Sequence, residues 1–163
     1  MMVRNERKGM TAGEIADKIC EIAPEALQET WDNSGFLAGS RKHPVTKVLT
    51  CLDLDFSVLK EAERLGCEMI VTHHPLLFSG IKKLTDEDPA GRLIRQLVQH
   101  DIAVYSCHTP FDKTKGGNND VLAGVLKLSN VRNLAGEKVG SPEDMVMREE
   151  EADIGRCGEF RRP

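Results

Sequence analysis

With 163 residues, 40% of them apolar and 29% charged, the chain is long enough for a hydrophobic core and too apolar for a disordered protein. The net charge of -4 and the absence of a long Lys/Arg stretch exclude the basic surface expected of a nucleic-acid-binding protein. No segment approaches the ~20 apolar residues of a membrane span, and residues 1–9 lack the apolar run of a signal peptide. We expect a cytoplasmic protein without a membrane partner, folded as a single domain over residues 1–163.

The elements predicted along the chain alternate between helices and short apolar strands. Thr11 and Glu14 form a capping-box pattern, which predicts a helix from there to Pro24. Turn-forming residues fill 31–41, with a candidate short strand at 36–38. Further on, the apolar patterns predict buried strands at 47–52, 68–72 and 102–107, helices at 56–65, 91–100 and 119–128, and candidate strands at 144–149 and 154–160.

This alternation predicts the fold class. Short strands that alternate with helices of about ten residues form parallel sheets, because right-handed crossovers place the helices over the sheet faces. We therefore expect a three-layer α/β fold, in which a mostly parallel sheet carries helices on both faces. We expect Asn118 or Asn119 to cap the helix at 119–128, and the two glycines at 116–117 to form a tight loop before it.

Polar side chains follow each of the three predicted buried strands, at the sheet edge where ligands bind in α/β proteins. They are Asp53 and Asp55 after the first strand, His73 and His74 after the second, and His108 and Asp112 after the third. An Asp between a strand and a helix is often an N-cap, and we favour that role for Asp55. Asp53 is either another cap or an acceptor for the histidines.

The adjacent His73 and His74 predict a metal site. Neighbouring side chains of an extended segment point to opposite faces, so the pair fits two ions, with one His on each, better than a single ion. Asp112 is the candidate bridging carboxylate. This mixture of ligands suits Zn, Mn, Fe, Co or Ni rather than Ca or Mg. In the alternative interpretation, the histidines only cap the sheet and Asp112 caps a turn at 113–117.

His108 has several possible roles, and the sequence leaves them open. An imidazole near the metal ligands can be a further ligand, an orienting hydrogen-bond partner or a proton carrier near neutral pH. We keep His108 as the candidate catalytic residue. His43 and His100 have no acidic or imidazole residue nearby in the sequence, so we expect surface positions for both.

These motifs together resemble one family. The chain is similar to the NGG-interacting-factor-three-like family, also labelled GTP cyclohydrolase I type 2 homologues, over roughly residues 11–160. The matching segments occur in the family's order, and they are WDNSG at 31–35, CLD at 51–53, VTHHPLLF at 71–78, HTPFD at 108–112, GGNND at 116–120 and IGRCGE at 154–159.

The resemblance implies a dinuclear divalent-metal site, a ring-shaped hexamer, and a hydrolase that acts on a small molecule, a purine nucleotide such as GTP. Its implied ligands fall here on His73, His74 and Asp112. The family's remaining His and Glu ligands belong to its C-terminal half and would lie beyond Pro163. No His of this sequence is followed four residues later by Glu. We therefore expect a copy truncated at the C-terminus, with an incomplete site that binds metal weakly.

Three functional interpretations follow from these observations. The first is a metal-dependent hydrolase of the GTP cyclohydrolase type. The second is a non-catalytic metal-binding scaffold or regulatory interaction protein, in which assembly matters and no turnover occurs. The third is an inactive gene fragment. Metal-dependent loss of GTP distinguishes the first interpretation from the second.

Overall fold

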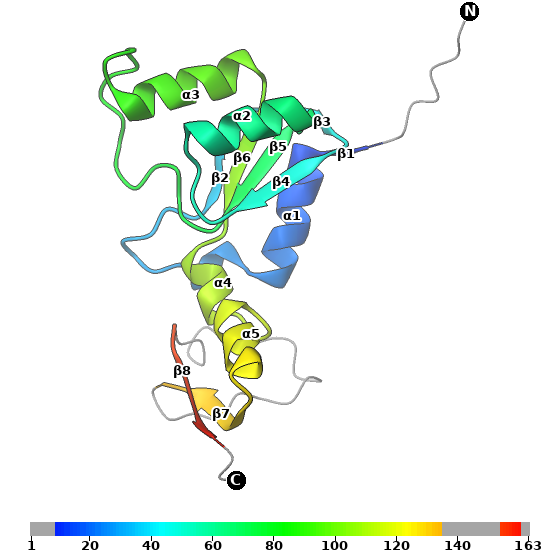
Figure 1. The fold of residues 1–163 in the computed structure, drawn as a ribbon, viewed down its shortest axis with the longest axis vertical. Helices are drawn as coiled ribbons and strands as arrows, with labels where there is room; N and C mark the ends of the chain where they lie inside the picture. Colours follow the sequence, from blue (N-terminus) through cyan, green and yellow to red (C-terminus); the bar gives the residue numbers. More distant parts are fainter. Residues whose placement is uncertain (1–8, 135–153, 161–163) are drawn as a thin grey trace, which may run out of the picture. The chain divides into compact units, whose positions relative to one another are not determined.

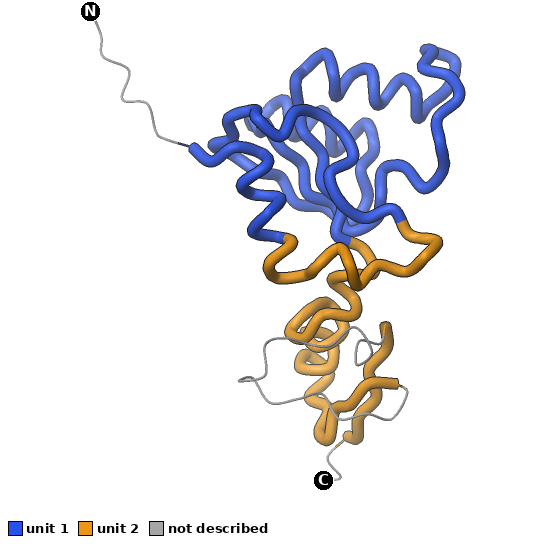
Figure 2. Tube along the Cα trace, turned by 180° about the vertical axis from the view of Figure 1, so that it is seen from behind, with its two compact units in different colours: residues 1–19, 33–107 blue, residues 20–32, 108–163 orange. Residues whose placement is uncertain are grey.

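The computed structural model describes residues 9–134 and 154–160 of the chain. These residues form two compact units, coloured separately in Figure 2. The first unit contains residues 9–19 and 33–107. The second contains residues 20–32, 108–134 and 154–160.

The first unit is built on a four-stranded sheet with the order β2-β6-β5-β4 (Figure 1). Strands β4, β5 and β6 are parallel, and β2 is an antiparallel edge strand. The mostly parallel sheet predicted from the sequence is therefore confirmed. The bounds are β2 Gly35–Ala38, β4 Val48–Cys51, β5 Met69–Thr72 and β6 Ala103–Ser106. A two-stranded sheet pairs β1 (Met10–Thr11) with β3 (Pro44–Val45).

Helices α2 (Phe56–Leu65) and α3 (Pro89–Gln99) cover one face of this sheet (Figure 1). The core between them holds Leu59 from α2 and Leu97 from α3, packed with Ile70 and Val104 of the two central strands. All four side chains are fully buried. Each contributes roughly 1.5–3 kcal/mol through the apolar surface that it removes from water. This core fixes the strands that carry the candidate site residues.

The opposite face of the sheet carries Met69 and Tyr105, which are also buried, and α1 (Ala12–Ile22) lies along that side in Figure 1. The capping box predicted for α1 is present. The Glu14 amide donates to the Thr11 hydroxyl over 3.2 Å, and the Thr11 amide donates to the Glu14 carboxylate over 2.7 Å. Helices on both faces confirm the α/β layering.

The second unit consists of η1 (Glu25–Leu27), α4 (Thr109–Lys113), α5 (Asn118–Val125) and an antiparallel pair of strands, β7 (Leu128–Asn133) and β8 (Arg156–Phe160). The buried Arg156 connects β8 to the helices. Its guanidinium binds the Asp120 carboxylate on α5 and donates to the Lys113 carbonyl oxygen at the end of α4, 2.9 Å away. The candidate strand at 154–160 is confirmed over Arg156–Phe160.

Three expectations about the secondary structure need correction, and a fourth concerns residues that the structure does not describe. β4 is half-exposed rather than buried, because it is an edge strand that pairs only with β5. Neither asparagine caps α5; its N-cap residue is Gly117. The helix predicted at 119–128 ends at Val125, and β7 follows. The candidate strand at 144–149 lies outside the described residues.

None of the helices in the described part of the chain is long and apolar enough to cross a membrane.

Candidate metal centre

His73 and His74 follow β5, at the carboxyl end of the parallel strands. The His73 amide donates to the Cys51 carbonyl oxygen over 3.1 Å, and the His74 amide donates to that of Leu52 over 2.9 Å. The Thr72 hydroxyl donates to the His74 carbonyl oxygen over 2.7 Å. These bonds attach the segment to the end of β4 and hold its backbone in place. The backbone positions from which the two imidazoles extend are therefore fixed.

The backbone bends at His73 and His74 instead of continuing as an extended strand. The expectation that the two rings point to opposite faces is therefore wrong. Their centroids lie 5.0 Å apart with an interplanar angle of 48°. β5 ends at Thr72, so the alternation of side chains that an extended strand imposes does not continue through His73 and His74. The two rings form one polar cluster.

The same kind of contact orients both rings. The His73 Nδ1 lies 3.1 Å from the Cys107 carbonyl oxygen, and the His74 Nδ1 lies 2.7 Å from Asp53 Oδ1. A carbonyl or carboxylate oxygen only accepts, so each Nδ1 carries a proton and donates it. Nε2 is then the nitrogen with the lone pair in each ring. Histidines that bind metals are held by such contacts, which fix their tautomer and orientation.

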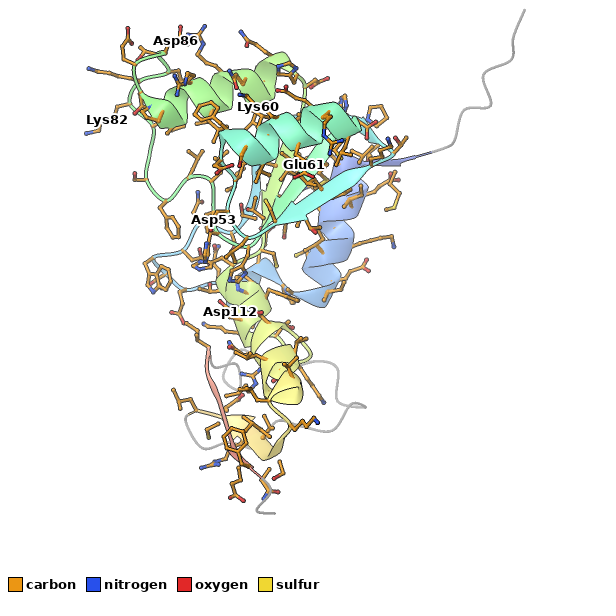
Figure 3. All side chains as sticks on the ribbon, viewed as in Figure 1. Asp53, Lys60, Glu61, Lys82, Asp86 and Asp112 are labelled. Carbon is orange, nitrogen blue, oxygen red and sulfur yellow. The ribbon has the colours of Figure 1, made fainter. Side chains whose placement is uncertain are left out.

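The structure separates the roles of the two aspartates that follow β4. Asp55 caps α2, as expected, by accepting from the amides of Ser57 and Val58 over 2.8 and 2.9 Å. The hydrogen bonds of the Ser57 side chain and the Val58 amide lower the pKa of Asp55. Asp53, labelled in Figure 3, is the hydrogen-bond partner of His74. Of the two alternatives for Asp53, the structure supports the acceptor.

In the second unit, Asp112 lies on α4, a short helix that the sequence patterns did not predict (Figure 3). The Asn118 side chain donates to Asp112 Oδ1 over 3.2 Å, and the Asn119 side chain donates to the Asp112 carbonyl oxygen over 3.2 Å. Of the two asparagines that were alternative caps for α5, Asn118 therefore orients the carboxylate of the candidate ligand, and Asn119 binds its backbone. A Cβ on Gly117 would lie 2.0 Å from the Phe111 carbonyl oxygen, so this tight loop requires glycine.

His108 immediately precedes α4 and contacts Asp32. The His108 Nδ1 lies 3.0 Å from Asp32 Oδ1, and the Asp32 side chain is fully buried. The Trp31 ring packs edge-on against His108 with a centroid distance of 5.9 Å. The WDNSG motif by itself indicates no role for Trp31 or Asp32. Asp32 and His108 are 76 positions apart in the sequence, so no local pattern indicates their contact.

The predicted site residues are thus divided between the two units of the chain. The first unit brings His73 and His74 together, supported by Asp53. The second unit carries His108 and Asp112 at the start of α4, supported by Asp32 and Asn118. His108 is the next residue after Cys107, whose carbonyl oxygen accepts from His73. That all four residues serve one metal centre stays a prediction.

Comparisons with known proteins agree with the motifs. The family described as Duf34/NIF3 (NGG1p interacting factor 3) matches residues 10–163. The chain belongs to this family. A GTP cyclohydrolase 1 type 2 homolog from Clostridium perfringens is 40% identical over 93% of the chain, and one from Bacillus subtilis is 37% identical over 78%. The resemblance inferred from the sequence motifs is confirmed.

Solved structures of the family share the fold. The chain matches a hypothetical protein from Staphylococcus aureus with a TM-score of 0.73 and 36% identity, covering 77% of this chain and 42% of that one. It matches reduced HcgD from Methanocaldococcus jannaschii with a TM-score of 0.72 and 35% identity, covering 80% and 52%. The chain spans 54% of the length of the Clostridium relative and 34% of the Bacillus relative.

Proposed function

We propose that this chain carries the metal-binding residues of a dinuclear-metal hydrolase that acts on a purine nucleotide such as GTP. The observation that carries the proposal is the pair of adjacent imidazoles at the end of β5. An acceptor oxygen holds the Nδ1 of each ring, so both rings are in the tautomer that ligates metal through Nε2. If the two histidines only capped the sheet, no oxygen acceptor would be needed at the Nδ1 of both rings.

The donor chemistry of these residues fits divalent transition metals. Two neutral imidazoles and a carboxylate suit Zn, Mn, Fe, Co or Ni. In the proposal His73, His74 and Asp112 would hold the ions, with Asn118 orienting the Asp112 carboxylate. When bound, the ions supply positive charge and lower the pKa of water. The proton transfers of the reaction are left to side chains of the protein.

His108 is the proposed catalytic residue. A hydrolase that opens the imidazole ring of a purine needs a base to take a proton from the attacking water and an acid to return it to the leaving nitrogen. An imidazole suits both steps, because it exchanges a proton near neutral pH. His108 occupies the position directly before the helix that carries Asp112, which supports its assignment to the same centre.

The substrate class rests on the relatives. Curated family members carry the name GTP cyclohydrolase 1 type 2 or its homolog, and one named without the qualifier, from Helicobacter pylori, is 38% identical over 62% of this chain. The proposal extends that substrate class to this protein, together with a cytoplasmic location and assembly into a homo-oligomer, a hexamer in the family pattern.

The first test measures metal binding. The purified chain is stripped with a chelator, dialysed against Zn²⁺ or Mn²⁺, and analysed for metal per chain. We expect His73→Ala and His74→Ala each to lower the bound metal by about 10-fold or more at subsaturating metal. His100→Ala is the matched control, because His100 also contacts a carboxylate, Glu63 at 3.1 Å, on α2. Equal metal content in all four proteins would contradict the metal site.

The second test measures turnover. Because the family's remaining His and Glu ligands would lie beyond Pro163, GTP is incubated with the metal-loaded chain fused to a C-terminal segment that bears such a His and Glu, and the products are separated by chromatography. Metal-dependent loss of GTP that His108→Gln abolishes, while metal content stays unchanged, is the result that the proposal requires. Bound metal without loss of GTP would favour the non-catalytic scaffold. Loss of GTP that is equal in the His108→Gln variant would remove His108 from its proposed role.

A further inference from the structure

The Asp32 carboxylate is the most completely surrounded acidic group near the candidate catalytic residue. Its side chain has no exposed surface. One oxygen, Oδ1, contacts the His108 Nδ1 at 3.0 Å. The other, Oδ2, accepts from the Thr109 amide over 3.1 Å and from the Thr109 hydroxyl. The carboxylate thus connects His108 to the first turn of α4.

The two oxygens of the Asp32 carboxylate differ in the hydrogen-bond roles that their partners can take. On the Oδ2 side the two contacts with Thr109 are both donated to the carboxylate. The Thr109 amide can only donate, and the Thr109 hydroxyl accepts from the Glu29 amide over 3.0 Å and gives its own hydrogen to Asp32. On the Oδ1 side the partner is an imidazole nitrogen, which can donate or accept. The fixed donors therefore determine which atom of residue 32 faces His108.

We propose that Asp32 is a positioning residue that holds His108 in the Nδ1-protonated tautomer and makes Nε2 the proton-accepting nitrogen. An ionised carboxylate only accepts, so the His108 Nδ1 must donate to it. The importance of Asp32 for turnover rests on the hydrolase function proposed above. The tautomer itself does not, because it follows from contacts within the second unit.

An amide at position 32 reverses the tautomer. In Asp32→Asn the amide oxygen must face the Thr109 amide, because the opposite orientation would place two donors against each other in a buried site. The amide nitrogen then faces His108 and donates to Nδ1. His108 responds by carrying its proton on Nε2. Size and shape are kept, so the substitution changes hydrogen-bond direction more than packing.

Asp53 provides the matched control. It contacts the His74 Nδ1 at 2.7 Å in the same way, but 69% of its side chain is exposed. No fixed donor holds its second oxygen among the contacts of the described residues. In Asp53→Asn the exposed amide can turn its oxygen toward His74, so the Nδ1-protonated tautomer of His74 persists. The same substitution thus predicts opposite outcomes at the two histidines.

The experiment is nitrogen NMR of the full chain labelled with ¹⁵N-histidine, metal-free and at pH 8, where an ordinary imidazole is neutral. His108→Gln and His74→Gln spectra assign the two rings among the five histidines. We expect Nδ1 of His108 to be protonated in the wild-type chain and Nε2 in Asp32→Asn. His74 should keep Nδ1 protonated in both the wild-type chain and Asp53→Asn.

The outcomes separate this inference from the proposed function. A wild-type spectrum with the His108 proton on Nε2 overturns the inference, whether or not the variants fold. An unchanged tautomer in a folded Asp32→Asn chain, checked by circular dichroism, overturns it as well. If the tautomer reverses and the chain leaves GTP intact even when fused to the segment that bears the missing His and Glu, the positioning stands and the hydrolase function fails. If the wild-type chain turns over GTP, reversal should abolish turnover while metal content stays unchanged.

Discussion

Removing the Arg156 guanidinium should destabilise the second unit. The Arg156 side chain is only 2% exposed and that of its partner Asp120 18%. Arg156 also donates to the carbonyl oxygens of Lys113 and Gly155 over 2.9 and 3.2 Å. In Arg156→Met an unbranched side chain remains at this position, but the Asp120 carboxylate loses its charged partner and the carbonyl oxygens of Lys113 and Gly155 lose a donor.

The size of the effect follows from burial. Breaking a buried ion pair by removing one partner costs about 3–5 kcal/mol, because the remaining charge is left without compensation. Asp120 keeps one bond, from the Gly116 amide over 2.6 Å, and some contact with solvent. We therefore expect the lower end, about 3 kcal/mol. The double variant Arg156→Met/Asp120→Asn should lose less than the single one, because no unpaired charge is left.

Trp31 gives the assay a local probe. It is the only tryptophan of the chain, and it lies in the second unit. Urea unfolding at pH 7, followed by Trp31 fluorescence, should show the loss of stability as a lower midpoint. The control is Arg95→Met, which breaks the exposed pair with Asp86 at 2.9 Å, with side chains 42% and 70% exposed.

Exposed pairs contribute about 0–1 kcal/mol, so Arg95→Met should move the midpoint little. Circular dichroism at the same urea concentrations checks that the comparison concerns unfolding and not a local change around Trp31. If Arg156→Met and Arg95→Met lower the free energy of unfolding equally, by under about 1 kcal/mol, the argument from burial is wrong. Arg156 would then not secure β8 to the helices.

Three further predictions concern other parts of the chain. Because hydrogen bonds lower the pKa of Asp55, its contribution to α2 is present above the unfolded pKa and lost as the pH falls through the folded value. The protection factors of the α2 amides, which are exchange rates corrected for the intrinsic rate at each pH, should therefore fall as the pH is lowered through the acidic range, and Asp55→Asn should flatten that fall. Burial, with the charges of Asp53 and Asp55, raises the pKa of the Cys51 thiol to about 11. The rate of Cys51 alkylation, followed by mass spectrometry, should therefore keep rising above pH 9, and a rate that reaches its plateau below pH 9 would contradict the raised pKa. Sedimentation across the micromolar range should show species larger than a monomer if the chain assembles as its family resemblance implies, and only monomers would count against assembly.

Short-range interactions made much of the fold predictable. The capping box at Thr11 and Glu14 and the cap of α2 at Asp55 involve residues two or three apart, so their pattern is visible in the sequence. Gly66 ends α2 with φ of 66°, a conformation that glycine adopts without strain. The apolar runs of β5 and β6 predicted buried strands because both are covered on two faces.

The elements that escaped prediction lack such local patterns. α4 has only five residues, which is too short to display helical periodicity. β7 contains an irregularity between Ser129 and Arg132, and Asn130 has φ of 52°, so its side chains do not alternate regularly. α5 begins at Asn118, so the cap position falls on Gly117, where the close approach of the Phe111 carbonyl oxygen leaves no space for a side chain.

The sequence by itself determined the family, the α/β class and the candidate donors His73, His74, His108 and Asp112, because strand ends and motifs are local features. Only the tertiary structure decided what orients these donors. Asp53 lies 21 residues from His74, Cys107 lies 34 residues from His73, and Asp32 lies 76 residues from His108. Hydrogen bonds across such separations depend on how the strands and helices pack, and no periodicity or capping pattern encodes them. The tautomers of the histidines, and with them the nitrogen that each presents, are therefore properties of the folded chain.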